Sequence, residues 1–120
     1  MHCLQHLTLN GTEGYVTTWP PFANDGHDVS ATNLVTKDNL RRLLHVPIYF
    51  FSGSENAVYS PESTDLSYTT LRDLGNEGLY ECDVFDGFGH LDCWVGEKAS
   101  EVIWPRVREQ MKKASRYHEG

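Results

Sequence analysis

The sequence has few of the features that mark secreted or membrane proteins. Its three cysteines, Cys3, Cys82 and Cys93, form no C-x-x-C pair and no even set. This argues against a disulfide framework or a structural zinc site and favours a reducing compartment. No apolar run approaches bilayer thickness, and no basic segment followed by an apolar one opens the chain. We therefore expect a soluble chain without a signal peptide or membrane span, cytoplasmic by default.

Positive charge is also scarce. Lysine and arginine total 10 against 17 acidic residues, which gives a formal net charge of −7. Nucleic-acid binding requires a basic face, so we expect no nucleic-acid partner. The short basic run near the end of the chain is interpreted as the solvated face of a helix; it consists of Arg106, Arg108, Lys112, Lys113 and Arg116.

The 120 residues, 39% of them apolar, are enough for one ordinary domain with a real core. The start of the chain is rich in Gly, Thr, Asn, Asp and Pro without periodicity, so residues 1–38 are predicted to be a loop-rich N-terminal segment. Thr36 is a candidate cap for a short helix or turn that ends before Pro47. Residues 39–120 are predicted to form the folded segment.

Two stretches predict strands. Ile48–Phe51 is a continuous apolar run between Pro47 and Gly53, as expected for a strand that is buried on both faces in a parallel sheet. The stretch "LYECDVF", residues 79–85, alternates apolar and polar positions and predicts a second strand near a sheet edge.

Two further stretches predict helices. Ser60 is a cap, Pro61 suits the first helical position and Gly75 is a stop, which predicts a helix over residues 61–74. From about Lys98, one apolar stripe predicts a final helix, in which Pro105 should produce a kink or a restart. The stripe consists of Ala99, Val102, Ile103, Val107 and Met111.

This order is a βαβα unit, and a crossover connection would make the two strands parallel. The loops that follow the strands, "SGSENAVYSP" and "DGFGHLDCW", then lie at the carboxyl end of the sheet, where open α/β sheets bind ligands. His90 is therefore predicted to lie where chemistry would occur. Asp92 is predicted to cap its turn, and Trp94 to pack in the core.

The remaining motifs do not predict a cofactor or metal site in this chain. His2, Cys3 and His6 have a metal-ligand spacing, but no matching third or fourth ligand is evident. The stretch "ANDGHD" has too few carboxylates for a calcium loop and is interpreted as a polar turn. The stretches "GFG" and "GNEG" lack the glycine pattern of a dinucleotide site.

The stretches "PIYFFSGSENAVYSPEST" and "GFGHLDCWVGEKASEVIWPRV" resemble the C-terminal part of an α/β-hydrolase fold. They are most similar to the hydrolase-like region of cholesterol-oxidase-related proteins, which belong to the glucose-methanol-choline oxidoreductases. The resemblance covers roughly residues 39–113, and its best motif is HLD-x-W-x-G. It implies a partial α/β-hydrolase fold, the last βαβα unit of a parallel sheet.

The resemblance places the catalytic histidine at His90, where it would take the proton of the nucleophile. The triad acid falls at Asn56, which cannot carry the charge, so Glu55 is the preferred alternative. The nucleophile motif G-x-S-x-G needs glycines four apart, and no two glycines in this sequence have that spacing. The resemblance thus implies a C-terminal fragment that is inactive alone.

Three functions follow as alternatives. The parent protein would act on a small ester or lipid-like substrate as a serine-type hydrolase. Alternatively, the chain is a module of a flavin-dependent sterol or alcohol oxidoreductase, with FAD bound elsewhere in a longer parent. In the third alternative it is a non-catalytic interaction piece that self-associates through an exposed sheet edge.

Overall fold

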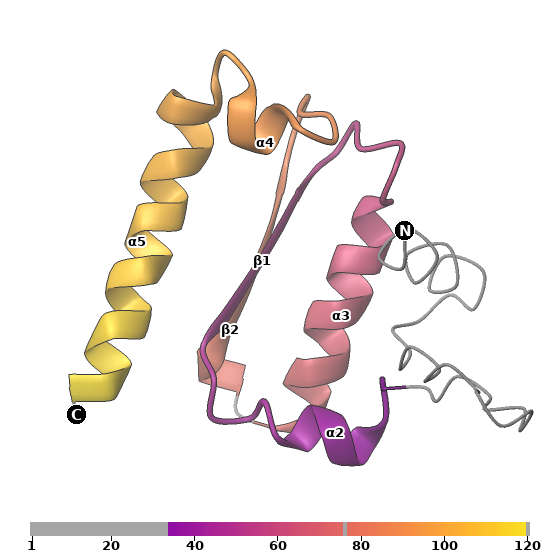
Figure 1. Cartoon of the computed structure of the whole chain (residues 1–120), viewed down its shortest axis with the longest axis vertical. Helices are drawn as coiled ribbons and strands as arrows, with labels where there is room; N and C mark the ends of the chain where they lie inside the picture. The colour runs from indigo at the N-terminus through magenta and orange to yellow at the C-terminus, as the bar shows by residue number, and fades with distance from the viewer. Residues whose placement is uncertain (1–33, 76, 120) are drawn as a thin grey trace, which may run out of the picture. The chain divides into compact units, whose positions relative to one another are not determined.

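The computed structural model describes residues 34–75 and 77–119 of the chain (Figure 1). The predicted loop over residues 1–33 and the H-C-x-x-H group of His2, Cys3 and His6 lie outside the described residues. The chain divides into two units, Met1–Arg42 and Leu43–Gly120.

The described part of the first unit contains helix α2 (Lys37–Arg41). The Oγ1 atom of Thr36 accepts a hydrogen bond from the backbone N–H of Asn39 at 3.3 Å, which satisfies one of the free donors at the helix start. The predicted cap and short helix are confirmed. The helix ends at Arg41, well before Pro47.

The second unit is mixed α/β and is built on a two-stranded parallel sheet. Strand β1 (Ile48–Gly53) pairs with β2 (Tyr80–Phe85), with Ile48 opposite Tyr80 and Gly53 opposite Phe85. Both predicted strands and their parallel direction are confirmed.

Helix α3 (Pro61–Leu74) connects the strands, followed by the short 3-10 helix η1 (Glu77–Leu79). The Ser60 hydroxyl accepts from the backbone N–H of Glu62 at 3.3 Å, and Gly75 ends the helix with a φ of 130°. Only a residue without Cβ adopts that φ readily, so Gly75 is a physical stop signal. The predicted bounds, cap and stop of α3 are confirmed.

Helices α3 and α5 (Ala99–Glu119) lie on opposite faces of the sheet (Figure 1). The face toward α3 includes Phe50, whose ring lies 6.5 Å from that of Tyr68. The other face carries Tyr49 and Asp83; the Asp83 carboxylate accepts hydrogen bonds from the Tyr49 hydroxyl and from the Arg106 guanidinium of α5. The described second unit is therefore a helix-sheet-helix sandwich.

The core of this sandwich is small. Its buried apolar residues are Leu71, Leu79, Tyr80, Cys93, Ala99 and Ile103. The prediction that Ile48–Phe51 is buried on both faces is only half met, because each of these residues stays partly exposed. A two-stranded sheet leaves one side of β1 without a neighbouring strand, so helices on both faces cannot cover the strand fully.

The predicted apolar stripe of α5 requires correction. Ala99 and Ile103 are buried, but Val102 is 45% exposed and Met111 is 68% exposed. Gln110 takes the buried position instead. The helix also runs through Pro105 without restarting. The buried stripe of α5 is narrower than predicted, because the two-stranded sheet covers only a narrow strip of the helix.

The basic run is likewise not simply a solvated face. Arg106 Nε donates to Asp83 Oδ2 at 2.7 Å, and Lys113 Nζ donates to Glu81 Oε1 at 2.9 Å. These pairs fasten α5 to the polar face of β2. The polar residues of that strand are partly exposed and pair with a helix.

Candidate functional site

Backbone hydrogen bonds join the two loops that follow β1 and β2. The N–H of Ser54 donates to the Phe85 carbonyl at 2.8 Å, and the N–H of Glu55 donates to the Phe88 carbonyl at 3.0 Å. The Ser54 hydroxyl accepts from the N–H of Gly87 at 2.9 Å. The parallel pairing thus continues beyond the strands and fixes one loop against the other.

Gly53 makes this close approach feasible. A Cβ atom built on Gly53 would lie 1.9 Å from the carbonyl oxygen of Phe88, far inside van der Waals contact. Any side chain at position 53 would push the histidine loop away. The glycine that closes β1 is therefore required by packing against the second loop.

The second loop turns directly into a four-residue helix, α4 (Asp92–Val95). The Asp92 carboxylate accepts from the backbone N–H of Gly89 at 2.7 Å, so its predicted role as a turn cap is confirmed. The sequence prediction missed α4, since a single helical turn has too few residues for a periodic pattern. This turn holds the backbone on both sides of His90.

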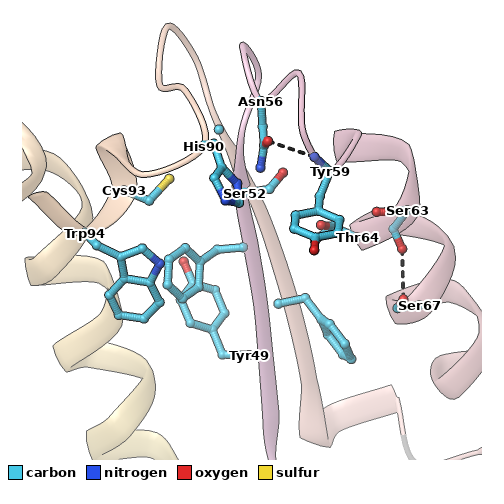
Figure 2. Close-up of a pocket in the computed structure, with 13 residues that line it drawn as sticks. Tyr49, Ser52, Asn56, Tyr59, Ser63, Thr64, Ser67, His90, Cys93 and Trp94 are labelled. Carbon is cyan, nitrogen blue, oxygen red and sulfur yellow. Dashed lines mark hydrogen bonds between the residues drawn. The ribbon is translucent and has the colours of Figure 1, made fainter. Parts of the chain in front are cut away.

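The loops, β1 and α3 enclose an open cavity of about 390 Å³ (Figure 2). Aromatic rings of β1 and Trp94 form one wall, and hydroxyl side chains of α3 form another. Among the described residues, no acidic or basic side chain other than His90 lines it. The lining residues are Tyr49, Phe50, Phe51, Ser52, Gly53, Asn56, Tyr59, Ser63, Thr64, Ser67, His90, Cys93 and Trp94.

The structure brings two of the three predicted site residues together. His90 and Asn56 both line the cavity at the carboxyl end of the sheet, whereas the exposed Glu55 does not line it. Among the described residues, His90 makes no hydrogen bond to Asn56 or to Glu55. The imidazole instead contacts the ring of Tyr59, with the ring centroids 5.4 Å apart.

The Asn56 side chain stabilises the first loop. Its Oδ1 atom accepts from the backbone N–H groups of Val58 and Tyr59, at 3.1 and 3.0 Å. This side-chain turn holds the first loop in shape. Because the Oδ1 atom is already used in this way, the Nδ2 group of Asn56 is the one that can donate a hydrogen bond to a ligand in the cavity.

Sequence reasoning missed Ser52 and Tyr59 as cavity residues. Ser52 is only 7% exposed, and its hydroxyl has no hydrogen-bond partner among the described residues. Figure 2 shows it beside His90 in the middle of the cavity. The alternation of side chains along β1 could have placed Ser52 on the same face as Phe50, but nothing in the sequence showed that its hydroxyl lacks a partner.

Trp94 and Cys93 follow His90 on α4. The Trp94 ring lies 5.3 Å from that of Phe51, yet Trp94 is 59% exposed, so the predicted core position is wrong. Cys93 is buried, and burial raises the pKa of its thiol. A raised pKa keeps the thiol protonated at neutral pH, which makes Cys93 a poor nucleophile.

Within residues 34–75 and 77–119, no group of three or more His, Cys, Asp or Glu side chains is placed to hold a metal ion. No helix in this part of the chain is long and apolar enough to cross a bilayer. The chain matches no protein-family profile, no curated protein and no solved structure.

Proposed function

We propose that this chain supplies the histidine side of an α/β-hydrolase-like active site that acts on a small ester or lipid-like substrate. The observation that carries the proposal is that His90 and Asn56 follow adjacent parallel strands and share one cavity. A base at this position would accept the proton of a nucleophile during acyl transfer.

The lining of the cavity supports an uncharged, partly apolar substrate. The rings of Phe50, Phe51 and Trp94 would contact an acyl chain, while Ser52 and Asn56 offer hydrogen bonds to an ester oxygen. The described residues that line the cavity carry no Lys or Arg, which disfavours phosphates and carboxylates as substrates, because those groups are best bound by a cation.

The proposal also requires a nucleophile from outside the sequence at hand, since it contains no G-x-S-x-G motif. The triad acid stays a prediction. Asn56 lines the cavity together with His90 and Glu55 does not, which supports Asn56 as the partner, and an asparagine would orient the imidazole without a negative charge. A flavin in a longer parent protein also stays a prediction from the resemblance.

Ligand titration tests the proposed site without a nucleophile. A linear alkyl methyl ketone, which mimics an ester but is not hydrolysed, should shift the NMR signals of His90 and Trp94 in a saturable way. The exposed His45, which does not line this cavity, is the internal control. Equal shifts at His45 and His90, or no saturation, would contradict the proposal.

The chain alone should hydrolyse p-nitrophenyl esters no faster than buffer does, because it lacks the G-x-S-x-G elbow that exposes a nucleophilic serine to the catalytic histidine. The His90→Ala variant should therefore match the unaltered chain. Turnover that a serine-directed phosphonate abolishes would show a nucleophile within this chain and overturn this part of the proposal.

The open side of β1 favours a second function, that of a non-catalytic interaction piece. Several large apolar side chains around it are exposed, among them Tyr59, Trp94 and Met111. Exposed apolar side chains beside the unpaired edge of a strand are typical of an association surface. Concentration-dependent association without ketone binding would favour this second function.

A further inference from the structure

His90 lacks the kind of partner that orients the histidine of a catalytic triad. In a triad, a carboxylate accepts a hydrogen bond from the imidazole and holds the ring in place. Among the described residues, neither Glu55 nor Asn56 makes this bond to His90, which is exposed. An exposed side chain without such a bond exchanges rapidly between rotamers. Another contact is needed if the imidazole is to keep one orientation.

The structure shows such a contact between the imidazole and the ring of Tyr59. The two ring centroids lie 5.4 Å apart, and the ring planes are inclined by 47°. Aromatic rings attract each other when their centroids are about 4.5–7 Å apart. Tyr59 lies in the loop after β1 and His90 in the loop after β2, and both line the cavity. The ring contact therefore links side chains from the two loops.

The backbone of Tyr59 is held on both sides. Its N–H donates to the Oδ1 atom of Asn56 at 3.0 Å (Figure 2), and the N–H of Asn56 donates to the Gly53 carbonyl at 3.2 Å. The next residue, Ser60, is the cap of α3. Because a fixed backbone allows a side chain few rotamers, the Tyr59 ring has a defined position beside the histidine.

The backbone around His90 is held in a similar way. The Phe88 carbonyl accepts from the N–H of Glu55 at 3.0 Å. The N–H of Gly89 donates to the Asp92 carboxylate at 2.7 Å, and this bond spans His90 in the chain. Hydrogen bonds in both loops therefore determine how close the two rings lie.

We propose that Tyr59 is a positioning residue for His90 and that Asn56 acts on the histidine through Tyr59. The inference rests on the proposed function, because an oriented imidazole matters only if His90 acts as a base. It also accounts for an asparagine at the acid position. The turn that holds Tyr59 needs an acceptor oxygen, and it does not need a negative charge.

NMR of the chain without ligand tests the ring contact. In the unaltered chain, NOEs should connect the ring protons of Tyr59 and His90, and the side-chain couplings of His90 should indicate one dominant rotamer. Tyr59→Leu should average these couplings, whereas Tyr59→Phe keeps the ring and should retain the rotamer. Tyr59 is 54% exposed, so these changes should leave the fold intact.

Tyr117→Leu is the matched control for Tyr59→Leu. Tyr117 is exposed to a similar extent, 47%, and does not line the cavity. The His90 couplings should be the same in this variant as in the unaltered chain. Averaged couplings in Tyr117→Leu would mean that the loss of any large side chain loosens the histidine, and would overturn the inference.

A second set of variants tests whether Asn56 acts through Tyr59. Asn56→Ala removes the acceptor oxygen and should average the His90 couplings as Tyr59→Leu does. Asn56→Asp keeps an acceptor oxygen and loses the amide donor, so it should retain the rotamer. Combining Asn56→Ala with Tyr59→Leu should cause no further change at His90, because both changes remove the same contact.

Three results would contradict the inference. They are a freely rotating imidazole in the unaltered chain, an unaltered His90 rotamer in Tyr59→Leu, and a larger change in the double variant than in either single variant. None of these measurements involves a ligand. The proposed function fails when the ketone does not bind in a saturable way, so the two failures are distinguishable.

Discussion

At the scale of single residues, Gly53 is the position on which the histidine loop most depends. The Gly53→Ala change would place a Cβ 1.9 Å from the Phe88 carbonyl oxygen. We expect a loss of about 1–3 kcal/mol in the free energy of unfolding, since backbone must move to relieve the clash. The NMR signal of His90 should shift as its loop moves.

Gly78→Ala is the matched control for this change. A Cβ on Gly78 meets nothing within 4 Å. Urea unfolding should show nearly unaltered stability for Gly78→Ala and a clear loss for Gly53→Ala. Equal stability of the two variants would mean that the loops are not held together as described.

Tyrosine hydroxyls and cysteine thiols with raised pKa values make the folded state less stable at alkaline pH. Burial and the hydrogen bond to Asp83 raise the pKa of Tyr49, and burial raises the pKa of Tyr80, Cys82 and Cys93. A raised folded-state pKa means that the folded state holds the proton more tightly than the unfolded state does. The resulting stability is complete below the unfolded pKa and is lost as the pH rises.

The free energy of unfolding should therefore fall as the pH rises above about 9, the ordinary value for cysteine, and fall further above the tyrosine value near 10. The Tyr49→Phe variant should lose less stability above pH 10, although losing the bond to Asp83 makes it less stable at neutral pH. A free energy of unfolding that stays constant from neutral to strongly alkaline pH would contradict this explanation.

At the scale of elements, local signals were enough for the strands and the connecting helix. Proline, serine and glycine at the ends of α3 each impose a backbone geometry, so its bounds could be predicted from residues 60–75 alone. The parallel direction of β1 and β2 followed from the crossover length. None of these predictions required knowledge of distant contacts.

The predictions that were wrong concern which side chains are buried. The stripe on α5 and the core position of Trp94 assumed a sheet wide enough to cover them, whereas the described sheet has two strands. Similarly, the sequence did not show that Ser52 and Tyr59 line the cavity with His90, because the two loops are held together through backbone pairing. Contacts of this kind depend on tertiary geometry that no local pattern encodes.

The docking of α5 on β2 is testable at this scale. Asp83 Oδ2 accepts from both Tyr49 and Arg106, at 2.7 Å each. We expect Asp83→Asn to reduce the free energy of unfolding by about 1–2 kcal/mol, because a partly buried cation and a phenol then share a neutral amide oxygen in place of a charged carboxylate.

Glu109→Gln is the control, since Glu109 pairs with the same arginine at 2.9 Å but its side chain is 55% exposed. An exposed pair within one helix contributes little, so the control should change stability by less than about 0.5 kcal/mol. If both variants lost the same stability in urea unfolding, the Asp83 network would not be what fastens the helix.

At the scale of the whole molecule, the structure is a parallel βαβ unit with an α-helix on each face and an open β1 edge beside the histidine cavity. The proposed acyl-transfer site lies in this cavity, beside the open edge. The sequence predicted the unit and its carboxyl-end loops. It could not show which edge is protected, because protection depends on Arg106 and Lys113 reaching β2 from a distant helix.

Hydrogen exchange along β1 in the dilute chain tests the open edge most directly. Amide groups of Phe50 and Ser52 face β2 and should exchange slowly, whereas those of Tyr49 and Phe51 face outward and should exchange much faster. Slow exchange at all four amides in a chain shown to be monomeric would contradict the account, because another segment would then already cover β1.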